Sequence, residues 1–327
     1  MILSGTESPA APRRPRRWRD FLLLGGLLAL VVAGMLGLAA ATGWEQIGAQ
    51  IARLGAVEIA VLLGLSLANY GLRALRWHLF ARRLGLPLTL WRNAVHFLGG
   101  LAMSVTPGRV GELVRMRWIR RETGWPFART APLVLIDRAS DLAAMAILLA
   151  LGLAFSAGGT AGALPVAILA LAGAFAVTRP RLLRGIAHLG HRLTARRFPR
   201  LFARLRAASR SLARFSAPSV LAAAGIFGLI GWAAEGYAFH YLLGLMGAEI
   251  ALPRAVLIFT FATLAGGLTG APGGVGGAEA AMVALLSLDG VPLDISIPAT
   301  AVIRLTTLWF ALLIGLVAFP LAERAPS

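Results

Sequence analysis

The chain has 327 residues, of which 58% are hydrophobic, and its mean hydropathy is +0.76. This apolar fraction exceeds what the interior of a soluble domain of this length can hold, so the composition predicts a membrane protein. The formal net charge is +18; all 32 basic residues are arginine, and the chain contains neither lysine nor cysteine. Lysine-based covalent chemistry, thiol catalysis, cysteine–metal sites and disulfides are therefore excluded. The arginines lie between apolar segments, where they indicate membrane topology rather than nucleic-acid binding.

Apolar runs long enough to cross a membrane recur along the chain. The first, at 21–42, follows an arginine-rich segment, and it is longer than the apolar core of a secretory signal peptide, so we expect it to be retained. Because a helix of about 20 apolar residues spans the hydrocarbon core of a bilayer, the pattern predicts six transmembrane helices. They are expected at 21–42, 57–80, 131–155, 163–178, 218–246 and 297–320.

Two further apolar segments, 93–119 and 254–288, are each interrupted near the middle by a similar cluster of glycine and proline. The first cluster reads SVTPGRVGELV and the second reads TGAPGGVGGAEAAM. Proline lacks an amide hydrogen and disfavours helix at the residue before it, whereas glycine bends freely. Since each half is too short to span a bilayer, we interpret both segments as re-entrant helical hairpins. Broken helices at corresponding places in two halves are typical of a transporter's substrate site.

The distribution of arginine predicts the orientation of these elements. With both termini in the cytoplasm, every arginine-rich loop lies on the cytoplasmic side, including 179–214 with its 11 arginines. The two hairpins then enter the membrane from opposite faces, which gives an all-α polytopic fold with an inverted repeat. The chain divides into a basic tail (1–19), a first transmembrane helix with its outer loop (20–56), repeat unit one with hairpin 93–119 (57–155), a transmembrane helix with an arginine-rich amphipathic linker (156–217), repeat unit two with hairpin 254–288 (218–320) and a C-terminal tail (321–327).

Charged residues inside apolar segments are costly and mark candidate sites. In unit one, Arg109 and Glu112 are three residues apart at the start of the helix after the break. A helix N-terminus and a guanidinium together suit an anion such as phosphate, although Glu112 could instead simply cap the helix. Asp137 and Asp141 share one face of the following span, where we expect them to neutralise Arg109 and Arg138. A proton-coupling role for these two aspartates is the alternative.

In unit two, the residues from Pro272 to Gly277 predict a backbone nest, in which Gly273 and Gly274 leave room for an anionic headgroup. Glu279 follows at the mouth of the returning helix. Arg304 stands alone in its span and needs an acidic partner, for which Glu279 and Glu235 are the candidates. A structural pair between Glu235 and Arg304 is as consistent with the sequence as a contact between Arg304 and a substrate.

The two breaks, the segment VLIDRASDL between them and the late segment IRLTTLW together resemble a known family. It is the flippase-like transmembrane domain of the lysylphosphatidylglycerol synthases, which also occurs as a stand-alone protein without the aminoacyl-transferase domain. The resemblance covers residues from about 55 to 320, and it implies re-entrant elements around a lipid cavity. By matching motif, it implies cavity roles for Arg109, Glu112, Asp137, Arg138, Asp141, Glu279 and Arg304.

These observations lead to one expected function and two alternatives. We expect a non-enzymatic protein of the bacterial inner membrane that moves an anionic or modified phospholipid, or a related isoprenoid lipid, across the bilayer. The expected partners are membrane lipids, without nucleic acid, metal or cofactor, and the oligomeric state stays open. The alternatives are a secondary transporter of a small anionic solute and a non-catalytic subunit of a membrane glycolipid pathway.

Overall fold

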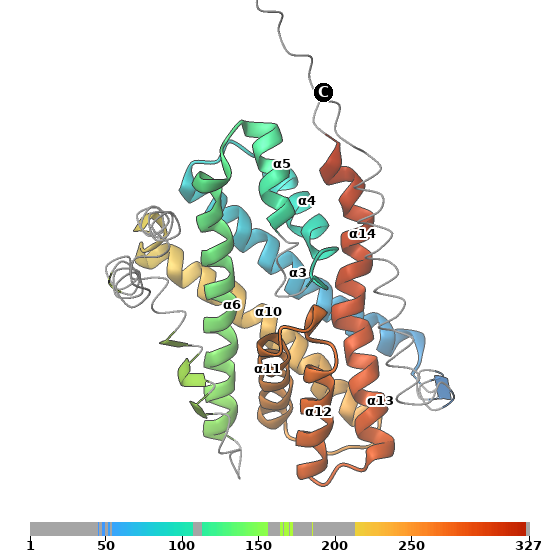
Figure 1. Cartoon of the computed structure of the whole chain (residues 1–327). Coiled ribbons are helices and arrows are strands. Elements are labelled where there is room, and N and C mark those ends of the chain that lie inside the picture. Colours follow the sequence, from blue (N-terminus) through green and yellow to red (C-terminus); the bar gives the residue numbers. More distant parts are fainter. Residues whose placement is uncertain are drawn as a thin grey trace, which may run out of the picture.

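The computed structural model describes residues 54–106, 113–155 and 213–324, with a few isolated positions outside these ranges. Throughout this part the chain forms helices joined by short connections, without a β-strand, as the sequence predicts (Figure 1). The predicted helix at 21–42 and most of the arginine-rich linker lie outside the described residues, and of the predicted helix at 163–178 only isolated positions are described.

The helices follow the apolar runs of the sequence. In chain order they are α3 (Ala56–Leu84), α4 (Leu90–Leu101), α5 (Val114–Thr123), α6 (Phe127–Phe155), η2 (Ala213–Phe215), α10 (Pro218–Leu245), α11 (Leu252–Leu268), η3 (Pro272–Gly274), α12 (Gly277–Leu288), α13 (Leu293–Arg304), η4 (Leu305–Trp309) and α14 (Phe310–Glu323). Within the described part, three stretches are both long and apolar enough to cross a membrane: α3, α10 and the continuous stretch from α13 to α14. The apolar helices α11 and α12 are shorter, as the interpretation of that segment as a hairpin requires.

Each broken segment folds into a hairpin whose two legs begin and end at the same end of the molecule. In the first hairpin, Arg92 in the first turn of α4 binds Glu122 in the last turn of α5. In the second hairpin, Arg254 near the start of α11 forms two hydrogen bonds of 2.6 Å with Asp289, directly after α12. Figure 1 shows the two hairpins at opposite ends of the molecule. An ion pair thus closes the base of each hairpin.

The two breaks meet at the centre. A methyl group placed on Gly273 of the second break would lie 3.5 Å from the side chain of Val105 in the first. Gly274 has a φ of +70°, and a methyl group on it would approach the backbone of Gly266 in α11 to 3.0 Å. Only glycine combines a positive φ with so close an approach at low cost. The glycines therefore let the legs of the second hairpin close on each other while its tip touches the first break.

The two halves of the chain repeat one pattern of helix contacts. The long helices α3 and α10 cross each other, α4 packs on α3, and α11 packs on α10. The first leg of each hairpin also packs on the last long helix of the other half: α4 lies on α14, and α11 lies on α6. By these contacts, α3 corresponds to α10, α4 to α11 and α6 to the stretch from α13 to α14. The hairpin of each half thus packs against the last helix of the other half.

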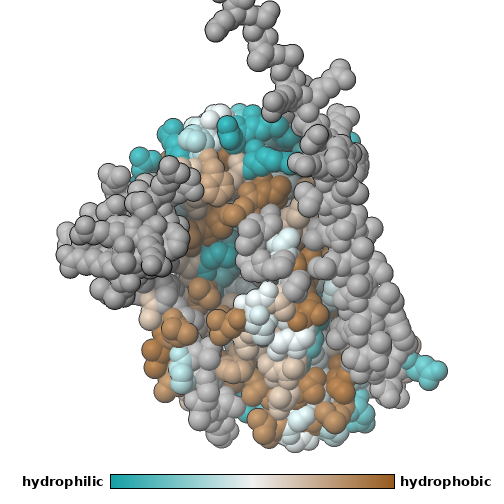
Figure 2. Space-filling view, viewed as in Figure 1, coloured by the Kyte–Doolittle hydropathy of each residue, from teal (hydrophilic) through white to brown (hydrophobic). Residues whose placement is uncertain are grey.

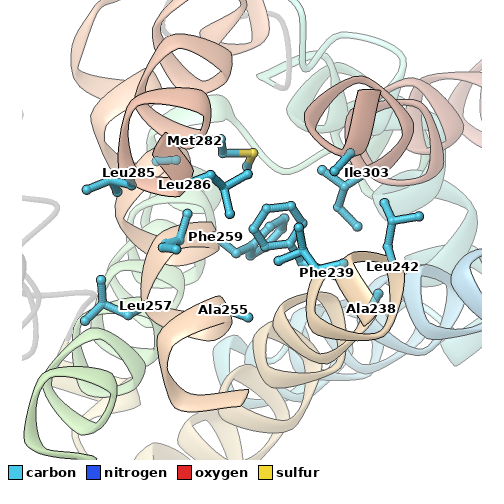
Figure 3. Packing of buried hydrophobic residues seen from close by; sticks show 14 of the residues in the cluster. Ala238, Phe239, Leu242, Ala255, Leu257, Phe259, Met282, Leu285, Leu286 and Ile303 are labelled. Atoms are coloured by element: carbon cyan, nitrogen blue, oxygen red, sulfur yellow. The ribbon is translucent and has the colours of Figure 1, made fainter. Parts of the chain in front are cut away.

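A large apolar cluster joins the helices of the second half (Figure 3). Phe239 of α10 and Phe259 of α11 face each other with ring centroids 6.1 Å apart, and Met282, Leu286 and Ile303 pack around them. Lipid chains are as apolar as these side chains, so in a membrane such a cluster stabilises the helices through close packing. Figure 2 shows the surface of the molecule in the view of Figure 1. The described residues on this face are mostly apolar, and hydrophilic residues gather at its upper end, near α5.

The contact between α4 and α14 depends on a glycine. A methyl group placed on Gly315 of α14 would clash with the backbone nitrogen of Ala102, at the end of α4. Replacing Gly315 with alanine should therefore push the first hairpin away from α14. We expect Gly315→Ala to lower the free energy of unfolding in detergent by about 1–3 kcal/mol, the usual range for overpacking.

The matched control is Gly71→Ala on the exposed face of α3, where a methyl group meets no atom within 4 Å. This change should leave the melting temperature unchanged or raise it slightly, because alanine favours helix over glycine. Equal melting temperatures for the two variants would contradict the close α4–α14 contact.

Candidate functional site

Five charged side chains form an ionic network between α3 and α6. Arg76 of α3 donates to Asp137 at 2.7 Å and to Asp141 at 2.6 Å. Arg73, one turn earlier, donates to the other carboxylate oxygen of Asp141 at 2.8 Å. The two arginines are three residues apart and the two aspartates four, so each pair shares one face of its helix. All four side chains are buried, in an interior where an unpaired charge would be most costly.

Arg138 completes the network from its edge. Its guanidinium lies 2.9 Å from Asp137 and 3.4 Å from Asp141, and 26% of its side chain is exposed. Trp232 of α10 donates its indole N–H to Asp141 at 3.2 Å, and the guanidinium of Arg73 lies 5.3 Å from the centre of the Trp232 ring. Three arginines and two aspartates give the network a net charge of +1.

The partners of the two aspartates differ in part from the expectation. Arg138 is confirmed as one of them, whereas Arg109 lies outside the described residues. The deeper partners, Arg73 and Arg76, were not anticipated. A signal for them is present in the sequence. Two arginines one helical turn apart inside an apolar run need acidic partners, and the two aspartates of α6 have the matching spacing and the opposite charge.

A second ionic contact lies at the other break. Arg304 of α13 donates to Glu279 of α12 at 2.5 Å and to the carbonyl oxygen of Gly273 at 2.9 Å. The second carboxylate oxygen of Glu279 accepts the amide hydrogen of Gly276 at 2.6 Å. Glu279 therefore caps α12 and also binds Arg304. The Gly276 amide, expected to face a headgroup, donates to this carboxylate.

The helix changes its hydrogen-bonding pattern directly after Arg304. Residues Leu305–Trp309 form a π-helical turn between α13 and α14. The hydroxyl of Tyr70 on α3 donates to the carbonyl oxygen of Thr307 in this turn at 2.5 Å. Short π-helical turns inside α-helices are frequent at functional sites, and this one lies beside the arginine that binds the second break.

A cavity of about 350 Å³ connects the two ionic contacts, and we call it the large cavity. Its charged lining residues are Arg138 and Asp141 of α6 and Arg304 of α13. Most of the remaining wall is apolar, with Leu142, Met145, Leu264 and Leu268 among its residues. At its rim Leu268 is 72% exposed, so the cavity opens to the surface of the molecule. On the face that Figure 2 shows, hydrophilic atoms appear at mid-height within otherwise apolar surroundings.

The large cavity gathers most of the described residues that the sequence singled out. Asp137 binds Arg138 and Glu279 binds Arg304, two residues that line the cavity, whereas Arg109 and Glu112 lie outside the described residues. Within the described ranges, no group of three or more histidines, aspartates or glutamates could hold a metal ion. The predicted residues that line the cavity are Arg138, Asp141, Gly273, Gly274 and Arg304.

Comparison with known proteins identifies the family. The sequence model of the lysylphosphatidylglycerol synthase TM region matches residues 22–315. The chain belongs to this family. The match extends across nearly the whole chain and, together with the apolar helices, indicates a multi-pass membrane protein with a role related to membrane lipids. Comparison with curated protein sequences gives no match.

The network predicts that its arginines differ in their importance for folding. Arg76→Gln removes the donor that both aspartates share and leaves the buried Asp137 with only the partly exposed Arg138 as its ionic partner. We expect it to lower the free energy of unfolding by about 3–5 kcal/mol, as for other broken buried ion pairs. Arg138→Gln leaves Arg73 and Arg76 in place, and Arg138 is partly exposed, so we expect a loss of about 1 kcal/mol or less.

Thermal unfolding of the two purified variants in the same detergent measures this difference. Arg76→Lys should also be destabilised, because lysine keeps the charge but not the geometry that lets one guanidinium bind two carboxylates. Equal stability of Arg76→Gln and Arg138→Gln would contradict the assignment of Arg76 as the centre of the network.

Proposed function

We propose that this protein moves an anionic or modified phospholipid, or a related isoprenoid lipid, from one leaflet of the membrane to the other. The observation that carries the proposal is the large cavity, which combines two arginines with an otherwise mostly apolar wall and an open rim. Its volume of about 350 Å³ falls in the range of small-molecule sites. A cavity that presents a few charged groups in a mostly apolar wall is complementary to an amphiphile.

The charge of the site favours a negatively charged headgroup. The network that includes Arg138 carries a net charge of +1, and Arg304 lines the same cavity. Guanidinium groups bind phosphate oxygens through directed, charge-assisted hydrogen bonds. The acyl chains would remain along the apolar wall near Leu268 or in the surrounding bilayer. Only the headgroup then needs a polar path.

The proposal requires no chemical change in the lipid. Asp141, the carboxylate that lines the cavity, is already bound by Arg73 and Arg76, and Glu279 behind it is bound by Arg304. We propose that the two hairpins are re-entrant from opposite faces of a bacterial inner membrane, with both termini in the cytoplasm. Their meeting point at the centre of the molecule then lies near the bilayer midplane, where transporter sites are commonly found.

Arg138 provides the test, because its loss should spare the fold. In proteoliposomes, the wild-type protein should accelerate the exchange of a fluorescent phosphatidylglycerol between leaflets. Arg138→Gln should slow this exchange by about tenfold, the effect of losing one charge-assisted contact of about 1.4 kcal/mol. The control is Arg120→Gln, which removes an exposed arginine on α5 far from the large cavity and should exchange lipid at the wild-type rate.

The same vesicles discriminate between the proposed function and its alternatives. Wild-type protein that leaves the lipid distribution unchanged but carries small anions such as phosphate would indicate a solute transporter. A wild-type protein inactive in both assays would contradict the proposal. Equal exchange rates for Arg138→Gln and Arg120→Gln would remove Arg138 from the site.

A further inference from the structure

Glu235 is a buried carboxylate of α10 that does not line the large cavity and has no role in the proposed headgroup site. Its side chain lines a second cavity of about 40 Å³, which we call the small cavity and which has room for water. Only 4% of Glu235 is exposed. An ionisable side chain inside a transmembrane helix is costly and by default marks a functional site.

Polar side chains from other elements surround this part of α10. Tyr70 of α3 and Ser104 of the first break line the small cavity together with Glu235. The hydroxyl of Ser104 is buried and forms no hydrogen bond with the described residues. The amide of Asn69 is buried without a partner as well, and it lies against Gly231, one helical turn before Glu235. Water in the small cavity can therefore bond to Ser104 and bring a proton to Glu235.

Four helices pack against α10, namely α3, α6, α11 and α13. Their ionisable side chains that line either cavity are Tyr70, Arg73, Arg138, Asp141 and Arg304. Helix α11 contributes none of them, and its Arg254 binds Asp289 at the base of the second hairpin. On α10 itself, His240 is hydrogen-bonded to the backbone of the loop that follows the helix.

Two carboxylates line the cavities, and they differ in what a proton would disrupt. Asp141 accepts hydrogen bonds from Arg73 and Arg76, so its protonation would weaken the network that joins α3 to α6. Glu235 lies outside that network of five side chains. It is therefore the carboxylate at the cavities whose charge can change while the frame of the first half stays intact.

The charges around the two cavities balance when Glu235 is ionised. We count the described charged residues that line either cavity, together with their ionic partners. The positive members are Arg73, Arg76, Arg138 and Arg304, and the negative members are Asp137, Asp141, Glu235 and Glu279. Equal numbers of each sign give no net charge. A bound anion would then leave one negative charge uncompensated in a poorly solvated interior, which is costly. A proton on Glu235 restores the balance.

We propose that Glu235 takes up one proton for each singly charged headgroup that enters the large cavity, so that the protein transports a proton together with an anionic lipid. The inference rests on the proposed function and deepens it, because it names the coupled ion. A proton from water bonds to a carboxylate oxygen of Glu235, and no covalent bond of the lipid changes. Trp232 and Arg304 line both cavities, so the proton site and the headgroup site are neighbours and their charges interact.

Binding of a fluorescent phosphatidylglycerol to the purified protein in detergent tests the coupling. The phosphodiester of this lipid keeps one negative charge across the neutral range, so pH acts on the protein. Because the protonated form binds the anion better, affinity should rise on acidification, by up to about tenfold for each pH unit over which Glu235 is ionised in the free protein. Glu235→Gln resembles the protonated side chain and should bind tightly without a response to pH.

The matched control is Asp294→Asn, which removes an exposed carboxylate that lines neither cavity. This variant should keep the wild-type response to pH. A pH response that persists in Glu235→Gln would refute the assignment of the proton to Glu235.

Two measurements on the wild-type protein decide the matter if Glu235→Gln does not fold. In weakly buffered solution, lipid binding should take up about one proton per lipid at a pH where Glu235 is ionised. In proteoliposomes, a pH gradient should make fluorescent phosphatidylglycerol accumulate in the leaflet toward which protons flow. A protonophore should abolish this accumulation.

Lipid exchange by the wild type that ignores the pH gradient, without proton uptake on binding, would overturn the coupling and leave the proposed function standing. Failure of the wild type to exchange lipid under any gradient would instead overturn the proposed function.

Discussion

The structure depends on the pairing of charges in an apolar interior. Taking an ion out of water costs several kcal/mol, and only close pairing with good geometry compensates for it. Arg73 and Arg76 can therefore reach Asp137 and Asp141 only if α3 and α6 cross at one height and in one rotation. This constraint fixes the frame of the first half and leaves Arg138 as the member of the network that borders the large cavity.

The second break is joined to α13 by a single ionic contact. Arg304 binds Glu279 and the carbonyl oxygen of Gly273. The π-helical turn after Arg304 also places its carbonyl groups in a pattern that can relax to an ordinary α-helix. A molecule that changes shape should do so where few contacts must be exchanged. That reasoning favours motion at the breaks over motion between α3 and α6.

The sequence predicts the features that are encoded locally and misses those that depend on tertiary contacts. Hydrophobic runs determine the positions of α3, α6 and α10, and glycine with proline determines the breaks, because both effects act within a few residues. The sequence narrows the acidic partner of Arg304 to Glu279 or Glu235, and in the structure Arg304 binds Glu279. The pairing of Arg76 with Asp137 joins residues 61 positions apart, and nothing in either segment encodes the crossing of their helices.

The shape of the large cavity bears on the choice between a lipid and a solute as cargo. A small hydrophilic anion must lose much of its hydration to enter a site, and it needs polar groups around most of its surface to replace that water. Most of the wall, including Leu142, Met145 and Leu264, offers no such groups, and the charged groups are confined to Arg138, Asp141 and Arg304. A lipid needs polar contacts only at its headgroup, and its chains can lie along the apolar wall at no cost in hydration. The exposed rim at Leu268 would then let the chains stay in the bilayer while the headgroup enters.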